Sequence, residues 1–423
     1  MKMLDSTLGV CVECGKIIPA DIVEEDEKVY MLKHHCKEEK ILIERDLRFY
    51  TDFQLPFKAK RPSMKIGKMA EDLTNDFKEV AGSVVYITSQ CNMKCPICYE
   101  KWAYKFPEPT FKEIEKIVSA TNGSYILLNG GEPTCREDLF KIITMVKGKG
   151  KDCLLFTNGM ALGDRDYVHK LKEADIDRVI LSFDGFNDKI YQKFRGRKLL
   201  DVKLKALKNL SEEKIETALV PVIDEDNKGQ IPKIIEFAIK HNETIKEVWL
   251  DSIYDNSNNP EITKGQILKE LIKATGASYE YLKEYKQFKI NLYKLIERYR
   301  GEKADNYTMF LYDAFPFKIV DGKLEQLFKT EDLKRLNKDM ETENPLNLLS
   351  QLGMIKKLYD YQKSNNKGIL RLYVCSIISP INMDLLRSVS IGRGIGDYVP
   401  PEGVRLGDGK PEKFFKNKLM QGT

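Results

Sequence analysis

The middle of the chain alternates between two hydrophobic patterns. Short runs rich in β-branched and aromatic residues are typical of strands. The stretches between them repeat their apolar positions every three or four residues, as helices do. The predicted strands are residues 84–88, 125–129, 153–157, 178–183, 217–222 and 247–253. The clearest predicted helices are residues 111–120, 138–147 and 231–240.

Six strands with helices between them predict βα units around a parallel sheet. Right-handed crossovers curl such a sheet toward a TIM-type barrel. Six units are too few to close the eight-stranded ring of the complete barrel. We therefore expect an α/β fold in which residues 81–255 form an open, partial (βα)6 barrel.

The segments on either side of this core follow other patterns. Residues 1–50 predict a small metal-binding knuckle, and residues 51–80, which include Pro56 and Pro62, predict a linker. The C-terminal region, residues 256–423, is expected to form an α/β cap over the open side of the barrel. Within it, residues 263–300 and 345–362 have helical patterns, residues 308–320 and 370–378 resemble strands, and the tail after Asp397 reads as irregular.

Composition narrows the class of protein. Of the 423 residues, 42% are hydrophobic and 31% charged, which is ordinary for a soluble globular chain. No apolar run approaches the ~20 residues that cross a bilayer, and the N-terminus lacks the apolar core of a signal peptide. A cytoplasmic location is therefore expected. Because thiols stay reduced there, the nine cysteines suggest metal ligands sooner than disulfides. The net charge of +5 is small and spread out, which argues against a nucleic-acid partner and leaves room for peripheral membrane contact.

Three cysteines carry the most specific chemistry. Cys91, Cys95 and Cys98 are spaced Cys-x3-Cys-x2-Cys between a predicted strand and a helix for which Thr110 is a plausible N-cap. Three thiolates can hold three irons of a [4Fe–4S] cube and leave the fourth iron open for a small molecule. A zinc knuckle, or three unrelated core thiols, is the plainer alternative.

With Tyr99 directly after it, this spacing resembles the signature of the radical SAM superfamily, and the resemblance extends over residues 84–254. It implies that the open iron binds the amino and carboxylate groups of S-adenosylmethionine. Reductive cleavage then gives a 5′-deoxyadenosyl radical that removes a hydrogen from the substrate. A small electron donor such as ferredoxin or flavodoxin is implied as a partner.

Further motifs fit the same resemblance. The run Gly130-Gly131-Glu132-Pro133 resembles the family motif that contacts the amino group of S-adenosylmethionine, although Gly and Pro also make plain turns. Adjacent glycines allow a ligand to approach the backbone closely.

The remaining predicted contacts to S-adenosylmethionine come from the ends of later strands. Ser182 and Asp184 resemble the residues that contact the ribose or methionine part, and Arg195 resembles an arginine that pairs with the methionine carboxylate. Arg195 could equally be a surface cation at a helix end. Asn158 could line the adenosine pocket or form a turn, and Val222 could pack on adenine or in the core. Tyr99 is expected near the adenine, where an aromatic ring can stack.

A second cluster lies near the N-terminus. Cys11 and Cys14 are followed by His34, His35 and Cys36, which is metal-ligand spacing for zinc or a single iron. His35 and His34 are the candidates for the fourth ligand. The alternative is that these cysteines bind nothing. A knuckle before a radical SAM core resembles the tetraether lipid synthase group, but Glu39 stands where that group usually has histidine.

These features favour a radical enzyme acting on an unactivated C–H bond, for which the tetraether resemblance implies a lipid or isoprenoid chain. Peptide or small-metabolite modification is the runner-up, although a cysteine-rich peptide-modifying SPASM domain is excluded because only Cys375 follows Cys153. An inactive metal-binding interaction protein is a third class, which would have no physical need for all the motifs. A lipid channel, or else ordinary core, would be lined by Met309, Phe310, Leu311, Tyr312, Phe315, Phe317, Leu370, Leu372 and Val374.

Overall fold

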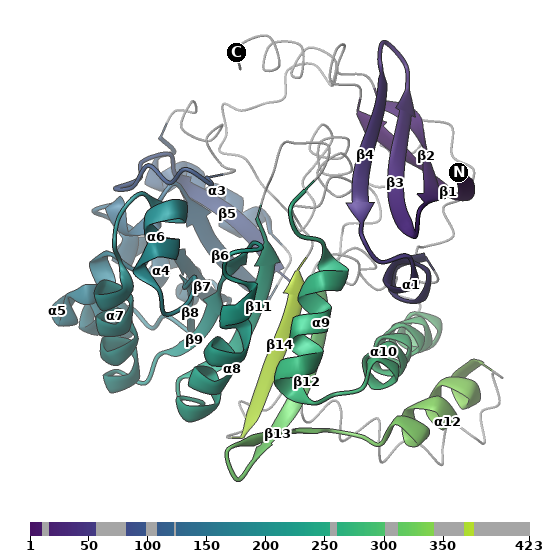
Figure 1. Cartoon of the computed structure of the whole chain (residues 1–423). Coiled ribbons are helices and arrows are strands. Elements are labelled where there is room, and N and C mark those ends of the chain that lie inside the picture. Colours follow the sequence, from purple (N-terminus) through teal and green to yellow (C-terminus); the bar gives the residue numbers. More distant parts are fainter. Residues whose placement is uncertain are drawn as a thin grey trace.

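The computed structural model describes residues 1–10, 17–55, 82–98, 108–121, 124–253, 260–300, 312–341 and 368–375, which form two separate sheets (Figure 1). The N-terminal sheet is antiparallel, with strands β1 (Lys2–Val10), β2 (Ile17–Glu25), β3 (Lys28–His34) and β4 (Glu38–Glu44) in chain order. Neighbouring strands of this sheet are antiparallel. The β1–β2 and β3–β4 connections therefore lie at the same end of this sheet.

The second sheet contains the barrel strands. Its order is β13-β12-β14-β11-β9-β8-β7-β6-β5, with β10 (Val222–Ile223) paired to β11. Besides the short β10, seven of its described strands run parallel: β5 (Gly82–Thr88), β6 (Tyr125–Gly130), β7 (Asp152–Thr157), β8 (Arg178–Ser182), β9 (Glu216–Val220), β11 (Ile245–Ser252) and β14 (Ile369–Cys375). At the far edge, β12 (Tyr312–Val320) and β13 (Lys323–Gln326) are antiparallel.

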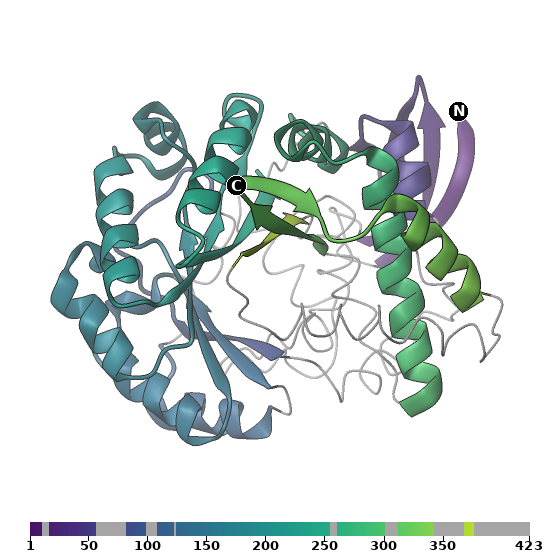
Figure 2. The same ribbon diagram turned by 90° about the horizontal axis from the view of Figure 1, so that it is seen from below.

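Helices cover the convex face of this curved sheet (Figure 2). They are α3 (Phe111–Ala120), α4 (Leu139–Gly148), α5 (Arg165–Glu173), α6 (Asp188–Arg195), α7 (Leu200–Glu212) and α8 (Ile231–Lys240). Toward the C-terminus follow α9 (Lys264–Thr275), α10 (Tyr279–Arg300) and α12 (Thr330–Glu341). Within the described ranges, no helix combines the length and apolar character that a membrane span requires.

The six predicted barrel strands are all present, and the open barrel is confirmed. One of them, residues 217–222, is split into β9 and β10 at Pro221, which has no N–H for the ladder. Thr110 caps α3 as predicted, through a capping box with Glu113.

The C-terminal region also contributes a strand to the barrel sheet, which the sequence did not predict. β14 pairs in parallel with β11, so a strand that lies more than a hundred residues later becomes the seventh parallel strand of the barrel sheet. Residues 51–54, assigned to the linker, belong to a π-helical turn (Tyr50–Gln54) after the short α1 (Leu47–Phe49). The predicted helix 345–362 and the tail after Asp397 lie outside the described residues.

The two faces of the sheet bury different side chains. Outward residues such as Val179, Leu219 and Val248 join the helices in the main core. Inward residues, one step along each strand, form a second apolar cluster of Ile180, Ala218 and Val220, with Leu127, Leu154, Phe156 and Trp249 packed against it. The concave side of the sheet thus has an apolar layer of its own.

This alternation corrects the predicted channel lining. Phe315, Phe317, Leu370, Leu372 and Val374 are at most 1% exposed and belong to the outward core. The rings of Phe315 and Phe317 pack on Tyr285 and Tyr281 of α10, with centroids 6.4 Å apart in each pair. They are core residues and cannot line a channel inside the barrel. Met309, Phe310 and Leu311 lie outside the described residues, and the structure describes no surroundings for the Tyr312 side chain.

The end of β4 packs against the start of α9. Glu44 is fully buried, and its carboxylate accepts hydrogen bonds from the Thr263 hydroxyl and, at 3.0 Å, from the Gly265 N–H. A Cβ on Gly265 would lie 2.8 Å from the nearer Glu44 oxygen, so glycine is needed for this contact. Burial raises the pKa of Glu44 to about 7 although these hydrogen bonds oppose the rise.

Candidate functional site

The cysteine loop begins where β5 ends, at the carboxyl edge of the parallel sheet. Cys91, Cys95 and Cys98 are reduced cysteines that are partly buried. The loop folds around Met93, whose N–H donates to Cys91 Sγ at 3.4 Å and whose side chain is buried with Tyr191. The Cys98 N–H donates to the Cys95 carbonyl at 3.1 Å. The loop therefore has local structure that holds its thiols in place.

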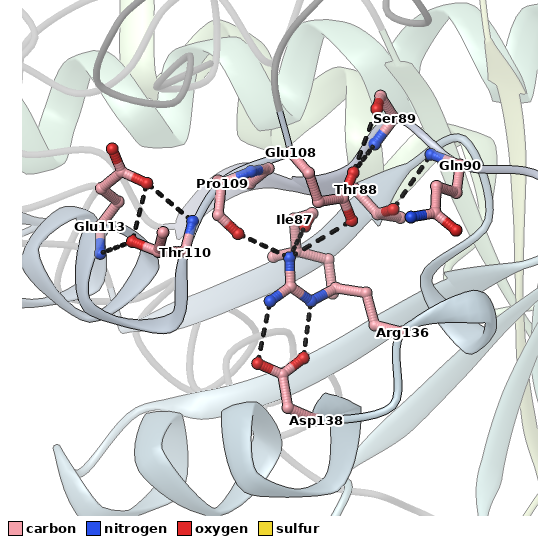
Figure 3. Close-up of polar contacts among 10 residues, drawn as sticks. All are labelled: Ile87, Thr88, Ser89, Gln90, Glu108, Pro109, Thr110, Glu113, Arg136 and Asp138. Carbon is pink, nitrogen blue, oxygen red and sulfur yellow. Dashed lines mark hydrogen bonds and ion pairs between the residues drawn. The ribbon is translucent and has the colours of Figure 1, made fainter.

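Arg136 ties the two ends of this loop together (Figure 3). Its guanidinium donates to the Ile87 carbonyl at 2.6 Å, on the strand that enters the loop, and to the Pro109 carbonyl at 2.8 Å, where the chain leaves it. A bidentate ion pair to Asp138, at 2.8 and 2.9 Å, fixes the guanidinium plane. Glu108 completes the closure by accepting from the N–H and hydroxyl of Ser89, at 2.9 and 3.0 Å.

The paired glycines let β6 approach the same loop. The Gly131 N–H donates to the Thr88 carbonyl at 2.9 Å, and the Glu132 N–H donates to the Gln90 carbonyl at 2.7 Å. A Cβ on Gly130 would lie 2.3 Å from the Thr88 oxygen, and one on Gly131 would lie 2.3 Å from the Gln90 oxygen. No real Cβ tolerates such distances, so both positions require glycine.

The Glu132 side chain is used inside the protein. It is 1% exposed. One oxygen accepts from the hydroxyls of Thr134 and Thr157, each at 2.7 Å, and the other accepts from the Asn158 N–H at 2.6 Å. This carboxylate joins the ends of β6 and β7, where Pro133 begins a short 3-10 turn. Any contact of this motif with an ammonium group is therefore left to its backbone.

Asp184 and Arg195 pair with each other. Asp184 is fully buried and binds Arg195 through two hydrogen bonds, from Nε at 2.7 Å and Nη2 at 2.8 Å. It also accepts from the Val222 N–H at 3.2 Å. Arg195 is accordingly no surface cation, which corrects that alternative, and two of its donors are already engaged. The expected free bidentate grip on a carboxylate ligand is absent in this arrangement.

Arg195 also faces the cysteine loop. Burial alone would lower its pKa, but the charge of Asp184 and the neighbouring Cys95 thiol outweigh burial and raise it. Burial raises the pKa of Cys95, and Arg195 opposes that rise. A permanent cation beside Cys95 favours the thiolate form that binds metal.

Sequence reasoning missed Lys203. It lies on α7, fully buried, and its ammonium donates to the Asn158 carbonyl at 2.6 Å, the Ser182 carbonyl at 2.7 Å and the Ser182 hydroxyl at 2.8 Å. Burial, assisted by the charge of Arg195, lowers its pKa to about 7. The available signal was its helical spacing with the buried Leu207 and Leu210, which places a lysine on an apolar face.

The structure thus brings most of the predicted residues to one edge of the sheet. Asn158 reaches the cysteine loop, because its Nδ2 donates to Asn92 Oδ1 at 2.8 Å. Val222 is partly buried beside Asp184. Tyr99 lies outside the described residues.

The donor set of three cysteines fits an iron–sulfur cluster. No three His, Cys, Asp or Glu side chains within the described ranges are gathered as ligands of one metal ion. A [4Fe–4S] cube takes one thiolate at each of three separate irons, so its cysteines need not converge on a point. Three reduced cysteines on one loop, with the buried Arg195 beside Cys95, meet that requirement.

The N-terminal residues are arranged as follows. Cys36 is exposed in the β3–β4 turn, at the end of the sheet to which the segment carrying Cys11 and Cys14 is also connected. Cys11 and Cys14 themselves lie outside the described residues. His35 is exposed, and His34 Nδ1 lies 3.5 Å from Glu38. Glu39, which replaces the expected histidine, forms an ion pair with the buried Lys33 at 2.8 Å.

Comparison with known proteins finds two family models that match parts of this chain. Residues 85–238 match the model of the radical SAM superfamily, and residues 3–38 match the HMPTM N-terminal zinc ribbon domain. The 7,8-dihydro-6-hydroxymethylpterin dimethyltransferase of Methanocaldococcus jannaschii is 30% identical over 270 residues, which cover 58% of this chain and 52% of that protein. A probable GTP 3′,8-cyclase of Pyrococcus horikoshii is 36% identical over 132 residues, which cover 29% of this chain and 41% of that protein.

Among solved structures, Streptococcus suis SuiB bound to S-adenosylmethionine aligns with a TM-score of 0.41 and 14% identity, covering 60% of this chain and 68% of that one. The chain spans about half the length of the curated relatives that it matches first.

Proposed function

From the premise that the chain contains a radical SAM domain behind a zinc ribbon, we propose that it cleaves S-adenosylmethionine reductively and removes a hydrogen atom from an unactivated C–H bond of a small polar metabolite. The observation that carries this proposal is the meeting of the cysteine loop, the paired glycines and the Asp184–Arg195 pair at one edge of the sheet. A small electron donor such as ferredoxin or flavodoxin and a cytoplasmic location belong to the same proposal.

Each group of site residues has a defined role in the proposed reaction. Cys91, Cys95 and Cys98 would hold a [4Fe–4S] cluster, which supplies one electron to bound S-adenosylmethionine and so gives access to the 5′-deoxyadenosyl radical. Gly130 and Gly131 let the backbone of the cysteine loop lie directly against the end of β6. Arg195, held by Asp184, keeps a positive charge beside Cys95. Lys203 fixes the Asn158 and Ser182 backbones on which the ligand would rest.

A small polar substrate is favoured over a lipid. Of the apolar residues that suggested an acyl channel, the five whose side chains are described belong to the outward core: Phe315, Phe317, Leu370, Leu372 and Val374. Two relatives are named for a pterin and for GTP, and both molecules contain a 2-amino-4-oxopyrimidine ring. We therefore propose a nitrogen heterocycle of this kind as the substrate class, in place of the lipid or isoprenoid chain.

The zinc ribbon is proposed to be structural. Cys11, Cys14 and Cys36, with His35 or His34, would hold one zinc ion at the end of the N-terminal sheet. This sheet is docked on α9 through Glu44, and no reacting group of the barrel belongs to it.

The test is anaerobic reconstitution with iron and sulfide, followed by addition of reductant and S-adenosylmethionine. The wild-type protein should absorb as an iron–sulfur protein and release 5′-deoxyadenosine. Replacing Cys91, Cys95 and Cys98 together with Ala should abolish both. Cys135→Ala, which removes a partly buried thiol outside the motif, is the matched control and should retain both. Wild-type iron and sulfide content in the triple variant would disprove the assignment.

A further inference from the structure

The concave side of the sheet carries a polar group that the proposed radical chemistry does not use. Leu250 of β11 belongs to the outward core and Trp249 to the inner cluster, so Asp251, two residues after Trp249, lies on the inner face. It stands near the carboxyl end of β11, in register with Val222 on one side and Cys375 on the other. This is the edge at which β5 leads into the cysteine loop.

One oxygen of Asp251 is both buried and unpaired. Its Oδ1 has no hydrogen-bond donor in the part of the chain that the structure describes. Burial raises the pKa of Asp251 to about 7, and the Ser252 N–H only partly offsets the effect. A buried carboxyl oxygen without a donor is destabilising. A ligand that brings N–H groups to this position would relieve the cost.

The rings of Trp249 and Tyr373 lie two residues before Asp251 and Cys375 along β11 and β14, and we call this pair of rings the aromatic floor. Trp249 and Tyr373 face each other across β11 and β14, with ring centroids 5.6 Å apart. Trp249 is held from underneath, because its indole N–H donates to Glu247 at 2.7 Å and Glu247 is itself bound by Arg178 and Arg371, each at 2.8 Å. Burial alone would raise the pKa of Glu247, but the two arginines outweigh it and lower the pKa, so the Glu247 carboxylate is favoured in its charged form.

We propose that Asp251 and this aromatic floor form the substrate-recognition site for a planar nitrogen heterocycle that carries a ring N–H beside an exocyclic amino group. The proposal rests on the proposed function and adds the residue that reads the substrate. A carboxylate offers two acceptors side by side, which match the two parallel donors of a 2-amino-4-oxopyrimidine edge. The face of such a ring suits aromatic contact. A hydrocarbon chain would leave Oδ1 unpaired.

The experiment measures equilibrium binding to reconstituted wild-type and Asp251→Asn protein, with S-adenosylmethionine present. The probes are 7,8-dihydro-6-hydroxymethylpterin and GTP, each beside its counterpart with oxygen in place of the 2-amino group: the corresponding dihydrolumazine and xanthosine 5′-triphosphate. Wild type should prefer one of the 2-amino compounds over its counterpart. Asp251→Asn should weaken that binding about tenfold or more, because one charge-assisted hydrogen bond is lost and an N–H then faces an N–H.

The substitution should also reverse the preference. An asparagine presents one acceptor and one donor, which match a ring N–H beside a C2 carbonyl, so the 2-oxo counterpart should bind the variant better than it binds wild type. Asp175→Asn, at a carboxylate whose side chain is 80% exposed, is the control and should bind as wild type.

Equal binding of all probes by wild type and Asp251→Asn would overturn the proposal. Should the variant fail to fold, the wild-type preference decides: a wild type that does not distinguish 2-amino from 2-oxo rings also overturns it. Release of 5′-deoxyadenosine is measured in parallel. A wild type that cleaves S-adenosylmethionine but binds neither 2-amino probe refutes this site and leaves the radical SAM function standing, whereas absence of cleavage refutes the function itself.

Discussion

Replacing Arg136 with Ala should loosen the cysteine loop at both of its ends. The guanidinium is 9% exposed, and its removal leaves the Ile87 and Pro109 carbonyls without their donor and Asp138 without its ion pair. Each buried acceptor left without a donor costs about 1–3 kcal/mol. Asp138 and Glu108 are about one-third exposed, so water compensates most of their loss and the ion pairs contribute less than about 1 kcal/mol. We expect a total of about 3 kcal/mol.

The loss of stability should affect the cysteine loop before it affects the whole protein. The assay is the rate of iron release from the anaerobically reconstituted protein in the presence of a chelator, followed by loss of the iron–sulfur absorption. If loop opening limits release, destabilisation by about 3 kcal/mol corresponds to release about a hundred times faster. Arg136→Lys should lie between wild type and Arg136→Ala, because an ammonium cannot bridge two carbonyls and grip a carboxylate in one plane.

Arg165→Ala is the matched control. Its guanidinium is 69% exposed and lies 3.4 Å from Glu212 on the outer helices, a pair that contributes at most about 1 kcal/mol. Iron release from this variant should match wild type. The reasoning would be refuted if Arg136→Ala retained its cluster as long as wild type did, since the closure seen in Figure 3 would then not limit the loop.

Three further predictions concern other parts of the molecule. A Cys11→Ser, Cys14→Ser double variant should lose about one metal ion by elemental analysis yet still release 5′-deoxyadenosine; a folded variant that has lost all cleavage would point to electron transfer instead. Because burial lifts the pKa of Glu44 from 4.5 to about 7, its protonated form is favoured on folding. Its stabilising contribution is full below pH 4.5 and declines as the pH rises to about 7, by on the order of 3 kcal/mol. Glu44→Gln should remove this pH dependence from urea unfolding curves, and an unchanged slope would contradict the assigned pKa. Lys203→Met should weaken S-adenosylmethionine binding about tenfold in calorimetry, because Asn158 and Ser182 lose a shared donor; unchanged affinity would show that Lys203 only fills the core.

Much of the site could be predicted because its signals are local in the chain. The three cysteines fall within eight residues, and the paired glycines sit directly after a strand, so spacing alone indicated their chemistry. The barrel strands were found because burial on two faces leaves a β-branched run bounded by turn residues. These patterns arise within one element and need no knowledge of its neighbours.

What the sequence could not provide were the pairings between elements. Nothing in residues 370–378 states that they will lie beside β11, because a strand's pattern records that it is buried and not which strand covers it. The same limit misplaced Phe315 and Phe317, whose apolar character fits the outward core as well as an inner channel. Lys203 was not singled out from the sequence, because its contacts at the ends of β7 and β8 arise only when α7 packs there.

The functional reading of Asp184, Arg195 and Asp251 depended on tertiary structure for a related reason. A charged residue can bind a ligand, pair with another side chain or face the solvent. The residue type in the sequence does not distinguish these three cases. Folding paired Asp184 with Arg195 and left Oδ1 of Asp251 without a donor among the described residues. Sequence determined which groups this protein could use, and three-dimensional packing decided which of them remain open to a ligand, because hydrogen-bond satisfaction is a property of neighbours in space.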